Sequence, residues 1–133
     1  MKAFTDIEQS KKLAEILPIE SADMWWAERY EGHTTMDFQY VIEETPYYYL
    51  SLKKPSIDNY SQDVINDIPC WSLAALLNIL DYPQLSKDKI GDGKVGWMVS
   101  VYLDNCRYDS IWYDSPIDAC YEMILKLHEL KML

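Results

Sequence analysis

The longest strongly apolar stretch of this chain lies near its middle, at residues 68–80, and reads IPCWSLAALLNIL. We predict a core helix here, because Ser72 is a suitable N-cap whose hydroxyl can accept from the free backbone N–H groups of the first turn. The leucines that follow fall on one stripe at three-and-four spacing: Leu73, Leu76, Leu77 and Leu80. The stretch is too short to cross a bilayer, which takes roughly 20 apolar residues. A central apolar helix constrains the fold and leaves the activity open.

Length and composition favour one folded domain. The chain has 133 residues, of which 49% are apolar and 14% are aromatic. Residues 1–17 contain no uninterrupted apolar segment, so we expect no signal peptide. The three cysteines, Cys70, Cys106 and Cys120, stand far apart and include no CxxC pair. This usage favours a reducing, cytoplasmic location over a disulfide framework, and we expect no membrane association.

The charge of the chain is acidic and uneven. There are 22 acidic and 12 basic residues, which gives a net charge of −10. Residues 1–69 hold 13 acidic and 6 basic residues (net −7), and residues 70–133 hold 9 and 6 (net −3). Because Lys and Arg hold phosphate backbones, we expect no direct binding of nucleic acid. Two interpretations stay open: self-repulsion that favours solubility, or an acidic surface that engages a basic partner.

The first half of the chain is predicted to form one helix and three strands. Thr5 and Glu8 have the spacing of a capping box at the start of the helix, and Pro18 ends it. Segments rich in residues that suit a pleated sheet predict strands at 24–30, 36–43 and 47–52. Residues 53–67 are rich in Pro, Ser, Asn and Asp, and we predict a long loop there.

The second half is predicted to continue with a polar linker at 86–94, a hairpin and a final helix. Apolar and polar residues alternate over 97–103, and the chain returns over 106–113 after turn residues Asp104 and Asn105. Ser115 caps the last helix, and Pro116 occupies its first position, where a missing N–H costs nothing. The core stripe of this helix is expected to comprise Ile117, Cys120, Met123, Ile124, Leu127 and Leu130.

These elements predict a single α+β domain over residues 1–133. Their order is α-β-β-β-α-β-β-α, which favours a mostly antiparallel sheet with helices packed on one face.

Histidine and cysteine positions suggest no metal or cofactor site. His33 and His128 are the only histidines, and both are expected on the surface. Zinc would need three or four N or S ligands, and no two candidates have the usual short spacing. Cys70 and Cys120 lie among apolar residues, so we expect them to be small core side chains.

Two further polar patterns have ordinary explanations. Residues 88–94 lack both the closing Glu of an EF-hand and the GK-[ST] ending of a phosphate loop, so we predict a turn. Four aspartates form an acidic series in the second half: Asp104, Asp109, Asp114 and Asp118. Paired carboxylates can perform acid–base catalysis in a cleft. These four fall in a turn, on a strand, beside a cap and in a first helical turn, so we predict no catalytic residue.

Aromatic composition is the most unusual feature. The chain has eleven Tyr and five Trp against two Phe. Rings with a polar edge are common where one side is buried and the other is wet, as at interfaces. We therefore predict an aromatic interaction surface on the strands of residues 36–52, formed by Tyr40, Tyr47, Tyr48 and Tyr49. The alternative is that the tyrosines only pack the sheet beneath its helices.

Three segments, 14–25, 68–77 and 116–129, carry a resemblance. They read AEILPIESADMW, IPCWSLAALL and PIDACYEMILKLHE. Together they resemble a group of small uncharacterised proteins encoded by phages and integrated mobile elements of gut bacteria. The resemblance implies a mobile-element setting and brings no activity, cofactor or catalytic residue with it.

Two functions are considered from the sequence. The first is a non-enzymatic accessory protein that acts by protein–protein contact, with a protein partner or a second copy of itself. The alternative is an acidic inhibitor that occupies the nucleic-acid-binding site of a host enzyme. An inhibitor of this kind should gather its carboxylates on one face, whereas a simple interaction protein should scatter them.

Overall fold

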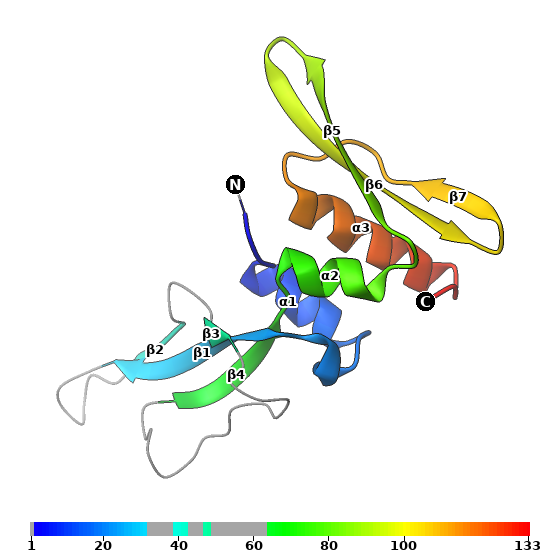
Figure 1. Cartoon of the computed structure of the whole chain (residues 1–133). Coiled ribbons are helices and arrows are strands. Elements are labelled where there is room, and N and C mark those ends of the chain that lie inside the picture. Colours follow the sequence, from blue (N-terminus) through cyan, green and yellow to red (C-terminus); the bar gives the residue numbers. More distant parts are fainter. Residues whose placement is uncertain (1, 32–38, 43–46, 49–63) are drawn as a thin grey trace. The chain divides into compact units, whose positions relative to one another are not determined.

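The computed structural model describes residues 2–31, 39–42, 47–48 and 64–133, with the backbone alone for residues 27–67 within these ranges (Figure 1). The predicted α+β class is confirmed, and so is the predicted order of helices and groups of strands. The chain divides into two compact units. Unit 1 combines Met1–Thr5 with Ser72–Leu133, and unit 2 is Asp6–Trp71. All strand pairs between the described strands are antiparallel, and they form two sheets, one in each unit.

Unit 2 begins with helix α1 (Ile7–Ala14). Its capping box starts one residue later than predicted: Asp6, and not Thr5, is the N-cap. The backbone N–H of Gln9 donates to Oδ1 of Asp6 at 2.8 Å, and the N–H of Asp6 donates to Oε1 of Gln9 at 3.1 Å. Thr5, the predicted cap, is fully buried and precedes the N-cap.

The sheet of unit 2 is built around β1 (Met24–Glu31). Its other strands are β2 (Gln39–Ile42), β3 (Tyr47–Tyr48) and β4 (Val64–Cys70). Met24 pairs with both Tyr48 and Cys70, so β3 and β4 lie on opposite edges of β1. Strand β4 corrects the prediction of a loop over 53–67, because residues 64–67 belong to it; residues 53–63 lie outside the described residues. Pairing with β1 decided the conformation where local composition suggested a loop.

Buried side chains from both the helix and the sheet form the core of unit 2. They include Leu13, Leu17, Ala22, Met24, Trp26, Ile68, Cys70 and Trp71. The indole N–H of Trp71 donates to Oγ of Ser21 at 3.0 Å, and Ser21 belongs to the short 3-10 helix η1 (Ile19–Ser21). A fully buried Trp thus has its one polar atom satisfied, as burial requires.

In unit 1 the central helix α2 spans Leu73–Ile79. The predicted N-cap is confirmed, since the N–H of Ala75 donates to Oγ of Ser72 at 3.2 Å. Residues 68–70, the start of the apolar stretch and ahead of the predicted cap, end β4. Among the described strands β4 pairs with β1 alone, and an edge strand of this kind tolerates Pro69.

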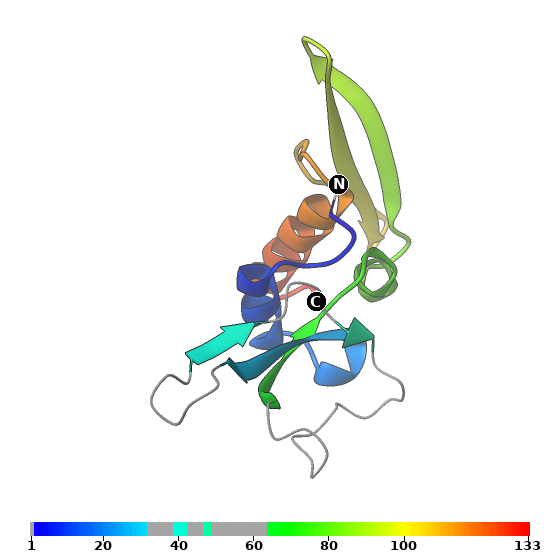
Figure 2. The ribbon, with the colours of Figure 1, turned by 90° about the vertical axis from the view of Figure 1, so that its left-hand side faces the viewer.

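The sheet of unit 1 runs in the order β5 (Gln84–Gly91), β6 (Lys94–Leu103) and β7 (Cys106–Asp109). The predicted hairpin of β6 and β7 is present, and Asp104 and Asn105 in its turn both have positive φ. The predicted linker at 86–94 is wrong: most of it is β5, which pairs with β6. Its polarity reflects a strand exposed along most of its length, and Figures 1 and 2 show the far end of this hairpin extending away from α3.

Helix α3 (Pro116–Glu129) covers one face of this sheet (Figure 2). Its predicted cap is confirmed, because the N–H of Asp118 donates to Oγ of Ser115 at 3.1 Å. The buried residues of the predicted stripe are Ile117, Cys120, Met123, Ile124 and Leu127. Leu130 is 50% exposed, so its assignment to the core was wrong; it lies beyond the last helical residue.

Residues 2–5 belong to unit 1, although they are far in sequence from the rest of that unit. Nζ of Lys2 lies 2.7 Å from Oδ1 of Asp118, and Phe4 forms a β-bridge with Ser72. Among the described helices, none combines the length and the apolar character that crossing a lipid bilayer demands.

Candidate functional site

The predicted tyrosine surface falls partly within the described residues. Tyr40 lies in β2 opposite Tyr30, whereas Tyr47 and Tyr48 lie in β3 opposite Trp25 and Met24. Because β4 occupies the other edge of β1 throughout, β2 and β3 follow one another along the same edge. Tyr49 lies outside the described residues. The backbone register places three of the four tyrosines along one edge of one strand, and the use of their rings stays a prediction.

Within the described part of the chain, the cysteines and His128 take part in no metal-binding cluster. Cys70 and Cys120 are buried and Cys106 is exposed, and all three are free thiols. Burial raises the pKa of Cys120 to about 12, so its thiol stays protonated and is a poor nucleophile. His128 is exposed on α3, and His33 lies outside the described residues. Across the described ranges, His, Cys, Asp and Glu side chains nowhere form a group of three that could hold a metal ion.

The aspartate series is distributed over separate structural roles. Asp109 accepts from Nε of Arg107 at 2.8 Å, and Asp118 pairs with Lys2. Asp104 lies in the β6–β7 turn with φ of 49°, and Asp114 is exposed before the cap of α3. Each carboxylate therefore has the local role that the sequence suggested.

The face of the β5–β6–β7 sheet that α3 does not cover is the most distinctive surface among the described residues. Val99 and Val101 point to the helix side, where both are fully buried. Side chains alternate along a strand, so the next residues point the other way. We call this second face the open sheet face. Its described members are Gln84, Ser86, Asp88, Ile90, Gly96, Met98, Ser100, Tyr102, Arg107, Asp109 and Trp112.

One end of the open sheet face is an aromatic hollow. Tyr82, Pro83, Gln84 and Tyr102 line a shallow depression with a volume of about 520 Å³. The side chain of Tyr82 is 83% exposed, and that of Tyr102 is 42% exposed. Tyr82 also has φ of 46°, in the left-handed region that bulky residues rarely occupy. This end therefore presents two exposed aromatic residues, and the backbone conformation of one of them, Tyr82, is sterically costly.

The other end of the open sheet face is an apolar cluster built over Gly96. A Cβ placed on Gly96 would lie 2.9 Å from Cδ1 of Ile90 and 3.2 Å from Cβ of Trp112. Ile90 and Trp112 therefore both cross the backbone of β6 at the one position that has no side chain. They remain 42% and 37% exposed, so the cluster forms a surface and not a core.

A compact polar group lies beside the aromatic hollow, where Arg107 is opposite Tyr102 and Asp109 is opposite Ser100. Arg107 donates from Nε to Asp109 and from Nη2 to Oγ of Ser100, the latter at 3.3 Å. The hydrogen bond from Ser100, and next the hydrogen bond from Arg107, lower the pKa of Asp109. The hydrogen bond and charge of Asp109 raise the pKa of Arg107. Both groups are charged at neutral pH and neutralise each other, so this pair adds no net charge to the face.

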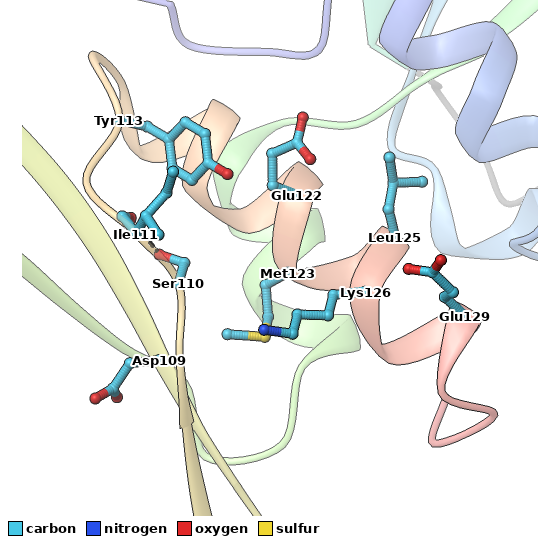
Figure 3. Close-up of a pocket in the computed structure, with 9 residues that line it drawn as sticks. All are labelled: Asp109, Ser110, Ile111, Tyr113, Glu122, Met123, Leu125, Lys126 and Glu129. Carbon is cyan, nitrogen blue, oxygen red and sulfur yellow. Dashed lines mark hydrogen bonds between the residues drawn. The ribbon is translucent and has the colours of Figure 1, made fainter.

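A second hollow, of about 370 Å³, lies between α3 and the segment that leads from β7 into it (Figure 3). Met123 and Lys126 project from the helix toward Ser110 and Ile111, while Glu122 and Glu129 border the hollow. Burial, and next the charges of Glu122 and Asp118, raise the pKa of Tyr113 in its wall. The lining mixes both charges with apolar groups, and no pair of carboxylates is positioned there for acid–base catalysis.

Sequence reasoning missed Tyr82 and Trp112, the most exposed rings at the two ends of the open sheet face. Tyr102 lies in the alternating segment 97–103, which the sequence predicted only as a strand. The available signal for Tyr82 was its position: an aromatic residue between Asp81 and Pro83, in a turn that follows an apolar helix. Turn positions are exposed, and a large ring there has no core to enter.

Comparisons of the chain with protein-family models, with curated proteins and with solved structures found no match.

Proposed function

We propose that this protein acts by binding another protein through the open sheet face of unit 1, without catalysis of its own. The observation that carries the proposal is the conformation of Tyr82. For an L-residue the left-handed region costs roughly 1–2 kcal/mol. A side chain can offset such a cost by becoming buried, yet Tyr82 is 83% exposed. Residues held in strained conformations cluster at active sites, ligand clamps and switch regions, so the strain at Tyr82 supports a binding role.

The composition of the face supports the same function. Tyr and Trp are enriched in protein interfaces because they bury a large area while few rotatable bonds become fixed. Tyr82 and Tyr102 stand at one end, and Trp112 with Ile90 at the other. The neutral Arg107–Asp109 pair beside Tyr102 can be covered at a smaller desolvation cost than an isolated charge. Exposed aromatic and apolar groups beside a satisfied polar pair suit a protein surface better than a small substrate.

The resemblance to proteins of phages and integrated mobile elements supports an accessory role in such an element. It fits a protein that modifies the behaviour of a host or element protein by contact.

The charge distribution supports a second candidate, an acidic inhibitor of a nucleic-acid-binding enzyme. Unit 2 holds 13 acidic and 5 basic residues (net −8), whereas unit 1 holds 9 and 7 (net −2). Most of the negative charge thus lies within residues 6–71, as a charge-based inhibitor would require. The nine carboxylates of unit 1 are spread over turns, strands and α3, which favours the first function for that unit.

The proposal is tested by capture followed by measured binding. Immobilised native protein is exposed to bacterial lysate beside a Tyr82→Ser/Tyr102→Ser variant and an Ile19→Ser control. Ile19 is a suitable control because it is 40% exposed and lies in unit 2. A captured protein that then binds the purified native chain and the control, but binds the double tyrosine variant at least about tenfold more weakly, supports the proposal. Equal binding to all three contradicts it. A partner whose binding weakens steeply with salt and ignores the tyrosines supports the inhibitor.

A further inference from the structure

We propose that the outer edge of β5 accepts an extended acidic segment of a partner protein as an added strand. The inference rests on the proposed function and gives it a second contact, made by backbone atoms at the rim of the open sheet face. Addition of a strand to an exposed sheet edge is a recurrent mode of peptide recognition, in which main-chain hydrogen bonds supply affinity and side chains supply selectivity.

The hydrogen bonds of β6 show which backbone groups of β5 are available. The N–H of Trp97 donates to the carbonyl of Tyr113 at 2.7 Å, and the carbonyl of Val99 accepts from Ser110 at 2.9 Å. These two residues of β6 therefore direct their backbone groups away from β5. Their partners across the ladder are Lys87 and Leu85.

In an antiparallel pair, residues opposite each other either exchange both hydrogen bonds or exchange none. Lys87 and Leu85 thus belong to non-bonded pairs, and their N–H and C=O groups point away from the sheet. Among the described residues nothing lies on that side of β5 to bond them.

Lys89 is the next residue of β5 whose backbone groups point away from β6, and it marks the end of the available edge. The N–H of Lys89 donates to Oδ1 of the neighbouring Asp88 at 2.8 Å, so this donor is already occupied. After Lys89 the register of β5 shifts, and Gly91 has φ of 143°. The available edge is therefore short and centred on Leu85 and Lys87, beside the aromatic hollow that begins at Gln84.

Charge selects an acidic occupant. Residues 84–95 hold three Lys and two Asp, a net charge of +1 in a chain of −10. Nζ of Lys87 lies 5.2 Å from the ring centroid of Trp97, which holds this cation in place over the strand. Side chains of directly opposed residues lie about 5 Å apart across an antiparallel pair. An incoming strand that reads acid-x-acid-x-apolar would set its acids against Lys89 and Lys87 and its apolar residue against Leu85.

The same lysines disfavour a second copy of the chain as occupant. When two β5 strands pair, residues whose backbone groups point away from β6 must face one another. A symmetric antiparallel pair of β5 strands therefore has its two-fold axis beside a residue and not between two residues. An axis at Lys87 sets Lys87 against its own copy, and an axis at Asp88 sets Lys87 against Lys89. These are the registers that overlap most of the strand, and like charges directly opposed are destabilising. Lysines on an edge strand thus block self-pairing while leaving an acidic strand free to bind.

Amide hydrogen exchange of the full chain tests the proposal with a synthetic probe. The probe is a capped hexapeptide, Thr-Glu-Thr-Glu-Thr-Val, and its control carries Lys in place of both Glu. In the free protein, the amides of Leu85 and Lys87 should exchange faster than those of Ser86 and Asp88. At a concentration about ten times its Kd, the acidic peptide should slow exchange at Leu85 and Lys87 about tenfold.

Variants separate the edge from the open sheet face. Lys87→Pro removes an outward N–H and should keep the fold while abolishing peptide binding, whereas Ser86→Pro removes an inward N–H and should destabilise the sheet. Lys87→Glu/Lys89→Glu should reverse the preference, so that the Lys peptide binds at least about fivefold more tightly than the Glu peptide. Tyr82→Ser/Tyr102→Ser should leave protection of the two amides by the peptide in place.

The outcomes are decisive in both directions. Protection of Leu85 and Lys87 by the acidic peptide alone supports the proposal. It is overturned by no binding at millimolar peptide, by binding without protection of these amides, or by protection that rises with protein concentration in the absence of peptide. Each of these failures leaves the proposed function standing if the tyrosine variant still loses its captured partner.

Discussion

Ile90 crosses the backbone of Gly96 so closely that a Cβ on Gly96 would lie 2.9 Å from both Cδ1 and Cγ2 of Ile90. This contact fixes one end of the open sheet face. It also explains why glycine occupies the middle of a strand, where it otherwise weakens the sheet. The side chain of Ile90 in β5 thus packs directly on the backbone of β6 near the tip of the β5–β6 hairpin.

Gly96→Ala should therefore destabilise the protein by about 1–3 kcal/mol, as overpacking does. Adding Ile90→Ala should recover part of that loss, because it removes the atoms that the new Cβ meets. Gly93→Ala is the matched control: it is strained by its φ of 77° but has nothing within 4 Å, so Ile90→Ala should not rescue it. Denaturant unfolding of the four variants measures the coupling, and its absence would show that the strand simply shifts.

Tyr82→Gly should stabilise the protein by about 1 kcal/mol, since glycine accepts positive φ without the steric cost of a Cβ. Tyr82→Ala keeps the Cβ and should leave the unfolding midpoint close to that of the native chain. A gain from both substitutions would trace the effect to the exposed ring and not to the backbone. The stabilised glycine variant should nevertheless lose affinity for the partner captured through the open sheet face.

Leu127→Ala should cost about 2–5 kcal/mol, because Leu127 is 2% exposed and its truncation leaves a cavity beneath α3. Leu130→Ala, only three residues further on, should cost no more than about 0.5 kcal/mol, because Leu130 is 50% exposed. Unfolding in urea compares the two directly. Equal midpoints would mean that α3 does not pack as described.

Thiol labelling should distinguish the three cysteines. In the native protein Cys106 is exposed and should react at once, whereas Cys70 and Cys120 are fully buried and should react only on unfolding. The pKa of Cys120, raised to about 12 by burial, slows its reaction further because the thiolate is the nucleophile. A Cys106→Ser variant should show no rapid labelling, and rapid labelling of a second thiol in native conditions would contradict this core.

Alkaline pH should weaken the fold partly through Tyr113. Burial and the nearby Glu122 raise its pKa above the ordinary value of 10.0, so the folded state holds the phenolic proton more tightly than the unfolded chain. The associated stability is present below about pH 10 and is lost as the pH rises through the raised pKa. Tyr113→Phe should reduce the fall in unfolding free energy over that range. An identical fall in both proteins would exclude Tyr113 as a contributor.

Local signals in the sequence predicted the helices well. Ser115 followed by Pro116 places the start of α3, and Ser72 places the start of α2, because caps act within one turn of the chain. The first cap was misplaced by one residue, since Thr5 and Asp6 are adjacent and both are good caps. The α+β class followed from the order of these elements.

Strands β4 and β5 could not be predicted from local composition. Asn66 and Asp67 in β4, and Lys87 to Lys89 in β5, are poor strand formers that pairing with β1 and β6 recruits into sheets. The candidate site was missed for the same reason. Tyr82, Gly96 and Trp112 come from three separated segments, and only the register of the sheet brings Gly96 under Trp112. Tyr40, Tyr47 and Tyr48 share an edge of β1, and their use as an interaction surface stays a prediction.

The N-terminal residues give the chain an unusual order of assembly. Lys2 meets Asp118 across 116 positions of sequence, and Phe4 bridges Ser72. During synthesis, residues 2–5 leave the ribosome before unit 2, whereas their partners Ser72 and Asp118 follow it. At roughly 5–20 residues per second, the segment from Ser72 to the end takes about 3–12 s to appear. All residues of unit 2 are synthesised before that interval begins. Unit 2 can therefore fold before α3, which Lys2 contacts, has been made.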